Sequence, residues 1–100
     1  MIEQPIDEQE SCEQIAELFK ALSDPTRVRI IAQLVSAEAC VHELASALHL
    51  TQSAVSHQLR LLRHLQVVRS RRAGRHIYYR LDDAHVRDLY ELAREHLEHG

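Results

Sequence analysis

The C-terminal part of the chain carries two pairs of side chains whose spacing is suited to metal binding. Asp83 and His85 form the first pair, and His96 and His99 form the second, with His96 eleven positions after His85. In a helix this separation spans about 16 Å, so one helix cannot bring both pairs to an ion whose bonds are about 2 Å long. The separation is also close to a whole number of turns, so both pairs face the same side. An antiparallel second copy of the helix would therefore bring the pairs together in two symmetry-related sites between subunits.

The residues between the two pairs support a contact between helices. Leu89 and Leu92 lie between His85 and His96, and steps of four, three and four residues separate these positions. That spacing is typical of the seam between two packed helices. Three imidazole nitrogens and one carboxylate oxygen make a closed tetrahedral shell, which favours Zn(II), with Co(II) or Ni(II) as competent substitutes. The ion would serve either as a regulatory ligand or only as a structural staple of a homodimer.

The middle of the chain is a second region with a chemical signature. From Leu44 to Leu81 there is no Asp or Glu, yet this block holds seven arginines, although the whole chain has a net charge of -3. Phosphate groups respond to the local electrostatic field rather than to the total charge. The block therefore predicts a surface that binds double-stranded DNA.

The same block has the pattern of a helix-turn-helix. A short helix over 41–48, a turn over 49–51 and a longer helix over 52–65 are expected, with Thr51 as the N-cap of the longer helix. The second helix of such a unit lies in the major groove, where its N-terminal half contacts base edges. The side chains of this helix that are predicted to contact DNA are Gln52, Ser53, Ser56, His57 and Arg60.

Two strands are expected directly after this helix. Residues 67–72 and 75–81 are rich in β-branched, aromatic and arginine side chains, and Ala73-Gly74 between them indicates the turn of a hairpin. This two-stranded hairpin would be the wing of a winged helix. The wing arginines predicted to contact phosphate or the minor groove are Arg71, Arg72 and Arg75.

The remaining segments predict helices around this unit. Ser11 and Asp24 are the expected N-caps of the first and second helices, and Asp82 or Asp83 is the expected N-cap of the last. The fold class is therefore mainly α with a small β-hairpin wing, which is a winged helix-turn-helix, and a homodimer is expected.

Length and composition limit the classes of protein further. One hundred residues predict a single domain over 1–100, in which residues 1–10 form a flexible arm. The sequence has no apolar run long enough to span a bilayer, so we expect a cytoplasmic protein without a membrane partner. It has no combination of nucleophile and base and no phosphate-binding loop, so we do not expect an enzyme. Two cysteines are too few for a disulfide framework, so reduced thiols are expected.

Three segments of the chain carry a recognisable series of sequence motifs. They are DPTRVRI, HELASALHLTQSAVSHQLRLLRHLQVV and GRHIYYRL. Together they resemble the ArsR/SmtB family of metal-sensing winged-helix repressors, and the resemblance covers residues 13–99. It implies a homodimer whose metal-free form binds an imperfect palindrome in operator DNA and leaves it when Zn(II) binds.

The resemblance extends to the metal ligands. Asp83, His85, His96 and His99 match, residue by residue, the C-terminal helix site of the zinc sensors in that family. The nickel sensors of the family take further ligands from the chain termini. The first ten residues here contain no His or Cys and the sequence stops at Gly100, which favours zinc.

The resemblance implies two further groups of residues. The second ring N–H of His96 would donate to the backbone carbonyl of Gln66 and so couple the metal site to the DNA-binding helix. Cys40 and Glu43 match a second family site, for which only Cys12 could add a thiol, so we interpret that site as vestigial. The alternative is a repressor of the same fold that responds to thiol oxidation or persulfides through its two cysteines.

Overall fold

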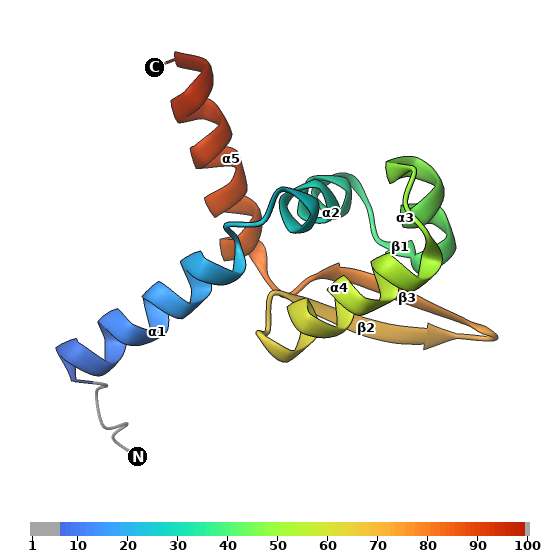
Figure 1. Cartoon of the computed structure of the whole chain (residues 1–100), viewed down its shortest axis with the longest axis horizontal. Coiled ribbons are helices and arrows are strands. Elements are labelled where there is room, and N and C mark those ends of the chain that lie inside the picture. The colour runs from blue at the N-terminus through green and yellow to red at the C-terminus, as the bar shows by residue number, and fades with distance from the viewer. Residues whose placement is uncertain (1–6, 100) are drawn as a thin grey trace.

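The computed structural model describes residues 7–99, and Figure 1 shows how its helices and strands are arranged. Within these residues there are five helices and one three-stranded antiparallel sheet. Their order is α1 (Glu8–Ala21), α2 (Pro25–Ser36), β1 (Ala39–Cys40), α3 (Val41–Leu48), α4 (Gln52–His64), β2 (Val68–Ala73), β3 (His76–Leu81) and α5 (Ala84–His99). The expected fold, a winged helix-turn-helix, is confirmed.

The core lies between α2, α3, α4 and the base of the sheet. Leu59 and Leu62 of α4 have no exposed surface, and neither does Ile30 of α2. Val68 and Leu81, which are paired at the base of the hairpin, complete the same apolar cluster. Burial of one face of α4 leaves its opposite face in solvent, so the core decides which side chains of this helix can meet a ligand.

Side-chain caps define the helix-turn-helix as expected. The Oγ1 atom of Thr51 accepts a hydrogen bond from the backbone N–H of Ala54 at 3.0 Å, and so begins α4. Asp24 caps α2 in the same way, with its carboxylate 3.0 Å from the backbone nitrogen of Arg27. The turn before α4 is tight because His49, which ends α3, has a left-handed backbone with φ of 55°.

The sheet has one strand more than the sequence predicts. The hairpin of β2 and β3 turns at Gly74, whose φ of 63° is easily adopted by glycine. In addition, β1 pairs with β3, with Ala39 opposite Tyr79, so β3 is the central strand. A strand of two residues has too few positions to show an alternating pattern, so only its pairing with β3 identifies it.

The first helix begins earlier than the sequence analysis predicts. Its N-cap is Asp7, whose carboxylate accepts from the backbone N–H of Glu10 at 2.9 Å, and Ser11 lies inside the helix. Residues 8–10, expected in a flexible arm, therefore form its first turn. Acidic side chains are stabilised at this end by the helix dipole, which explains the extension. Residues 1–6 of the expected arm lie outside the described residues.

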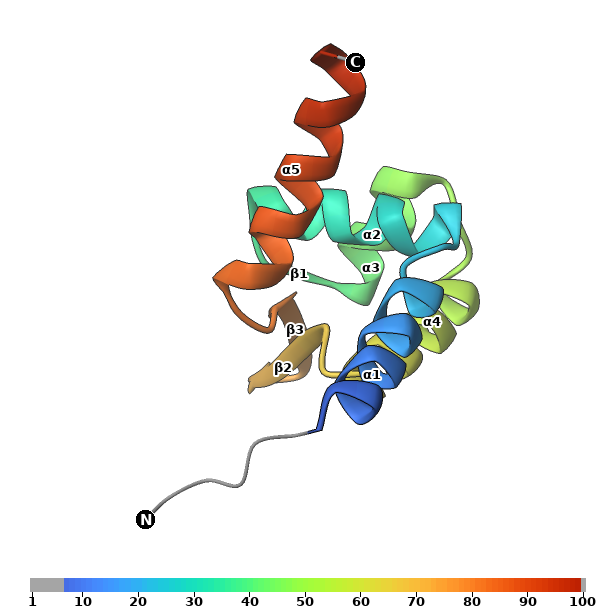
Figure 2. The same cartoon turned by 90° about the vertical axis from the view of Figure 1, so that its left-hand side faces the viewer.

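Figure 1 shows α1 and α5 extending away from the body that holds α2, α3 and α4, and α5 also projects from it in Figure 2. No residue of Ala84–His99 is buried, and Leu92 and Leu97 are 64% and 80% exposed. Phe19 of α1 is also more than half exposed, at 54%. Large apolar side chains gathered on two projecting helices are typical of an interface that needs a partner. Among residues 7–99, no helix is long and apolar enough to cross a membrane.

Candidate functional site

The exposed face of α4 and the wing enclose a basic hollow of about 530 Å³. Arg60 and Arg63 of α4 line one side of it, and Arg75 and His76 at the wing tip line the other. Gln52 and Ser56 of the predicted set also line the hollow, and Ser53 and His57 are exposed on α4 outside it. Half of the eight predicted DNA-contacting side chains, Gln52, Ser56, Arg60 and Arg75, therefore line one hollow.

Sequence analysis missed Arg63 as a member of this surface. It lies three residues after Arg60 and seven after Ser56, which is one face of a helix, so its spacing could have identified it. Its guanidinium Nη1 atom is 3.4 Å from the hydroxyl oxygen of Ser70 in β2. This contact connects the DNA-binding helix to the wing.

A contact between α3 and α4 orients Gln52, the first residue of α4. The side-chain nitrogen of Gln52 lies 3.2 Å from Nδ1 of His42. An amide nitrogen can only donate, so Nδ1 accepts and the ring proton of a neutral His42 sits on Nε2. The contact leaves the carbonyl oxygen of Gln52 free to accept a hydrogen bond from a base edge. His42 had no assigned role in the sequence analysis.

The three predicted wing arginines do not lie on one face of the hairpin. Side chains alternate along a strand, and Ser70 contacts Arg63 of α4, so Arg72 is on the α4 side and Arg71 is on the opposite side. Arg71 forms an ion pair with Glu38, with Nε 3.1 Å from Oε2, and its guanidinium carbon is 5.1 Å from the ring centre of Tyr78. The hydrogen bond from Arg71 lowers the pKa of Glu38.

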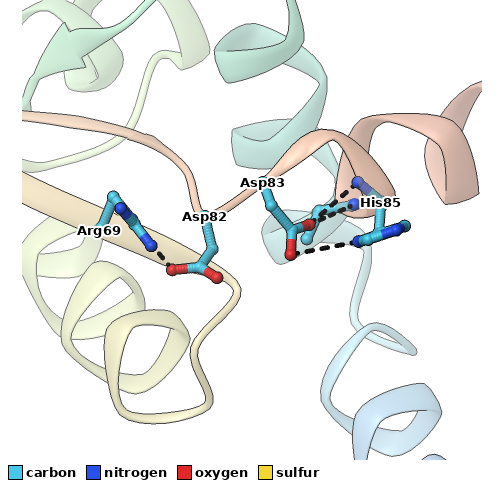
Figure 3. A network of polar contacts seen from close by, with 5 residues as sticks. Arg69, Asp82, Asp83 and His85 are labelled. Atoms are coloured by element: carbon cyan, nitrogen blue, oxygen red, sulfur yellow. Dashed lines mark hydrogen bonds and ion pairs between the residues drawn. The ribbon is translucent and has the colours of Figure 1, made fainter.

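Asp83 and His85, the first pair of candidate metal ligands, are adjacent at the start of α5, as Figure 3 shows. One oxygen of Asp83 accepts from the backbone N–H groups of His85 and Val86, at 2.9 Å and 3.3 Å. Asp83, rather than Asp82, is therefore the N-cap of this helix. Its other oxygen lies 3.3 Å from Nδ1 of His85, and this contact is the main reason why the pKa of Asp83 is lowered.

His96 and His99, the second pair, line a shallow hollow near the other end of α5 together with Leu92 and Glu95. Nδ1 of His99 is 2.9 Å from the backbone carbonyl oxygen of Glu95. Because a carbonyl can only accept, Nδ1 carries a proton and a neutral ring has its lone pair on Nε2. A hydrogen bond of this kind orients a histidine for metal binding through its other nitrogen.

One chain does not assemble the four candidate ligands. The continuous helix α5 separates the two pairs, and within residues 7–99 no three metal-binding side chains are close enough to hold one ion. The donor types nevertheless fit a divalent metal, because imidazole nitrogen and carboxylate oxygen are both zinc ligands.

Gln66, the predicted acceptor for His96, lies in the turn between α4 and β2. Its backbone is left-handed with φ of 61°, and its N–H donates to the carbonyl of Arg63 at 3.0 Å. Gln66 lines a hollow of about 490 Å³ together with Asp83 and His85, whereas His96 of the same chain does not line it.

The structure does not bring the three residues of the predicted thiol site together. Cys40 is 8% exposed, and its backbone N–H donates to the carboxylate of Glu43 at 3.0 Å, which is the main cause of the lowered pKa of Glu43. Cys12 is exposed on α1, and Figure 1 shows α1 and α3 on opposite sides of the molecule. Both thiols are free.

Comparison with known proteins places this geometry in a family. Residues 24–70 match the model of the family described as bacterial regulatory protein, arsR family. The chain is 47% identical over 89 residues to a transcriptional repressor SmtB homolog of Synechocystis sp.. The aligned residues are 89% of this chain and 67% of that protein. The chain therefore belongs to the arsR family of bacterial transcription regulators.

Two other similar proteins extend this comparison. A cadmium resistance transcriptional regulatory protein CadC homolog of Staphylococcus aureus is 43% identical over 83 residues, which are 82% of this chain and 69% of that protein. The solution structure of a homodimeric winged helix-turn-helix DNA-binding domain from Mycobacterium bovis, a possible ArsR-family regulator, has a TM-score of 0.84. It is 32% identical, and the match covers 100% of this chain and 96% of that one.

Proposed function

We propose that this protein is a metal-responsive transcriptional repressor. In its metal-free form a homodimer binds operator DNA, and Zn(II) binding between the subunits lowers its affinity for that DNA. Membership of the arsR family supports the DNA-binding part of the proposal. Two relatives, a transcriptional repressor SmtB homolog and a cadmium resistance regulatory protein homolog, support the repressor and the metal-responsive parts.

DNA would be contacted by α4 and by the side of the wing that faces it. Gln52, Ser56 and Arg60 would reach base edges in the major groove, with Ser53 and His57 beside them on the exposed face. Arg72 and Arg75 of the wing would contact phosphate. Arg63 joins these two arginines because it lines the same hollow as Arg75. In a two-fold dimer the two copies of α4 would be separated by about 34 Å, one turn of DNA, so an imperfect palindrome is expected.

The observation that carries the metal proposal is the distribution of ligands along an exposed helix. Asp83 and His85 are adjacent at one end of α5, and His96 and His99 are at the other end, so neither end has a complete shell. Leu92 lies between them and is 64% exposed. A second copy of α5 running antiparallel would cover Leu92 and add the missing pair at each end. When bound, Zn(II) would join the two subunits through a closed shell of four protein ligands.

Metal binding would be coupled to DNA binding at the hollow that Gln66 lines together with Asp83 and His85. A partner histidine that completes the shell beside Asp83 and His85 would lie near this hollow. The free N–H of His96 of the partner subunit would then donate to the carbonyl of Gln66, at the end of the DNA-binding helix. By thermodynamic linkage, DNA must weaken metal binding by the same factor by which metal weakens DNA binding.

The test is fluorescence anisotropy of the protein on a palindromic fragment from upstream of its own gene, at fixed salt, with Zn(II) and then chelator added. Reversible release that disappears in Asp83→Ala and His96→Ala variants would support the proposal. Unchanged DNA affinity with a zinc-dependent rise in dimer stability would replace it with a structural staple. A Cys12→Ser/Cys40→Ser variant serves as the control, because loss of release in that variant would favour the thiol alternative.

A further inference from the structure

Asp82 connects three elements at the point where the wing meets α5. Its backbone N–H donates to the carbonyl of Val67, in the turn after α4, at 2.9 Å. Its carboxylate accepts from Nε of Arg69 in β2 at 3.1 Å. The next residue is Asp83, the N-cap of α5, and Figure 3 shows the Arg69–Asp82 ion pair beside the contacts of Asp83 with the start of α5. One residue therefore contacts both the turn after α4 and the wing, and it directly precedes the N-cap of α5.

The local charges explain why Asp82 holds Arg69. In the β2–β3 ladder Arg69 lies directly opposite Arg80, and like charges in this arrangement repel each other. Asp82 supplies a negative charge next to this pair. Its side chain is 26% exposed and that of Arg69 is 53% exposed, so the ion pair is only partly screened by water.

We propose that Arg69 and Asp82 are positioning residues that couple the start of α5 to the wing. Asp82 shares a peptide bond with Asp83 and is held on its other side by Val67 and Arg69, so a shift of the backbone at Asp83 would be passed to Asp82. Asp82 then moves β2 through Arg69. This coupling lies within one chain, and it is separate from the contact proposed above between His96 and Gln66. Its role in metal response rests on the proposed function, but its existence in the metal-free protein does not.

The size of the effect is limited by the exposure of the pair. A partly exposed ion pair changes an equilibrium by at most about fivefold, so the pair can carry only part of a larger metal response. We therefore expect Arg69→Gln to reduce the zinc-dependent change in DNA affinity by about threefold to fivefold. The variant should keep the zinc affinity of the free protein, because Arg69 contacts no candidate ligand.

Arg71→Gln is the matched control. It also removes one arginine from the outer side of β2 and also breaks an ion pair, but the partner there is Glu38, which is distant in sequence from Asp83. Each variant is compared with its own metal-free DNA affinity. A general loss of DNA affinity caused by the missing charge is therefore not mistaken for a loss of the zinc response. Arg69→Lys should restore the response, because a lysine ammonium can still pair with Asp82. Thermal unfolding of each variant establishes that it is folded.

A second measurement needs no metal. Amide hydrogen exchange is followed by NMR at His85 and Val86, whose N–H groups donate to Asp83. Arg69→Gln should accelerate exchange at these amides by about threefold to fivefold, whereas Arg71→Gln should not. Equal exchange in both variants would overturn the coupling.

The two measurements separate this proposal from the proposed function. If Zn(II) fails to release the wild-type protein from DNA, the proposed function fails, and the exchange rates still decide whether Asp82 couples α5 to the wing. If the wild type is released and both variants respond equally to zinc, the role of Arg69 in the response is wrong and the proposed function stands.

Discussion

Arg71 of β2 is paired with Glu38, the residue before β1, and this contact holds its side chain on the side of the wing away from α4. Arg72, the next residue, lies on the α4 side. Two neighbouring arginines that look equivalent in the sequence therefore have different surroundings. Only one of them is positioned to meet DNA that contacts α4 without first breaking an ion pair.

The salt dependence of DNA binding should distinguish these arginines. Each phosphate contact that is lost reduces the slope of log affinity against log salt by about 0.9. A homodimer carries two copies of each substitution, so we expect Arg75→Ala to reduce the slope by about 1.8, and Arg71→Ala to leave the slope close to that of the wild type. Anisotropy titrations at several salt concentrations measure the slopes. A full reduction in Arg71→Ala would mean that DNA displaces Glu38.

The ion pair of Glu38 should make wing stability depend on pH in the acid range. The pKa of Glu38 is lowered from its ordinary value of 4.5 in the folded protein, mainly by the hydrogen bond from Arg71. Its contribution is therefore complete above 4.5 and is lost as pH falls through the lowered pKa. Denaturant unfolding of the wild type and Glu38→Gln should differ near neutral pH and converge in acid. A difference that stayed constant with pH would contradict this origin.

Sharing of the metal site between subunits can be tested by mixing two variants. One variant carries Asp83→Ala and His85→Ala, and the other carries His96→Ala and His99→Ala. Neither homodimer should bind Zn(II) tightly, because every site lacks one pair of ligands.

The mixed dimer should bind one Zn(II), because one of its two sites then has all four ligands and the other has none. Isothermal titration before and after subunit exchange measures the stoichiometry. If the mixture binds no better than its components, the ligands do not come from two subunits.

The exposed leucines of α5 predict the dimer interface. Leu92 is 64% exposed in one chain, and a charge placed there would be buried against a second copy of the helix. We expect Leu92→Asp to sediment as a monomer. Arg87→Asp, on the opposite side of α5, is the control and should remain a dimer. Monomeric behaviour of both variants would indicate a general loss of structure.

Local signals in the sequence predicted most of the fold. Asp24 and Thr51 cap their helices as expected, and the wing turns at Gly74, because caps and turns depend on residues within a few positions of one another. One prediction from such a local signal was wrong. Ser11 is of a residue type that caps helices well, but Asp7 is the N-cap of α1. Strand β1 was missed because it exists only through its pairing with β3.

The sequence by itself determined the chemistry that this protein has available: the arginine block, the polar face of α4, and two pairs of candidate metal ligands that cannot meet within one helix. The tertiary structure decided which of these groups are available. It paired Arg71 with Glu38, which is 33 positions away, and placed Gln66 beside Asp83 and His85. Such contacts depend on how distant segments pack, and the pattern of residues along a single helix or strand carries no information about that packing.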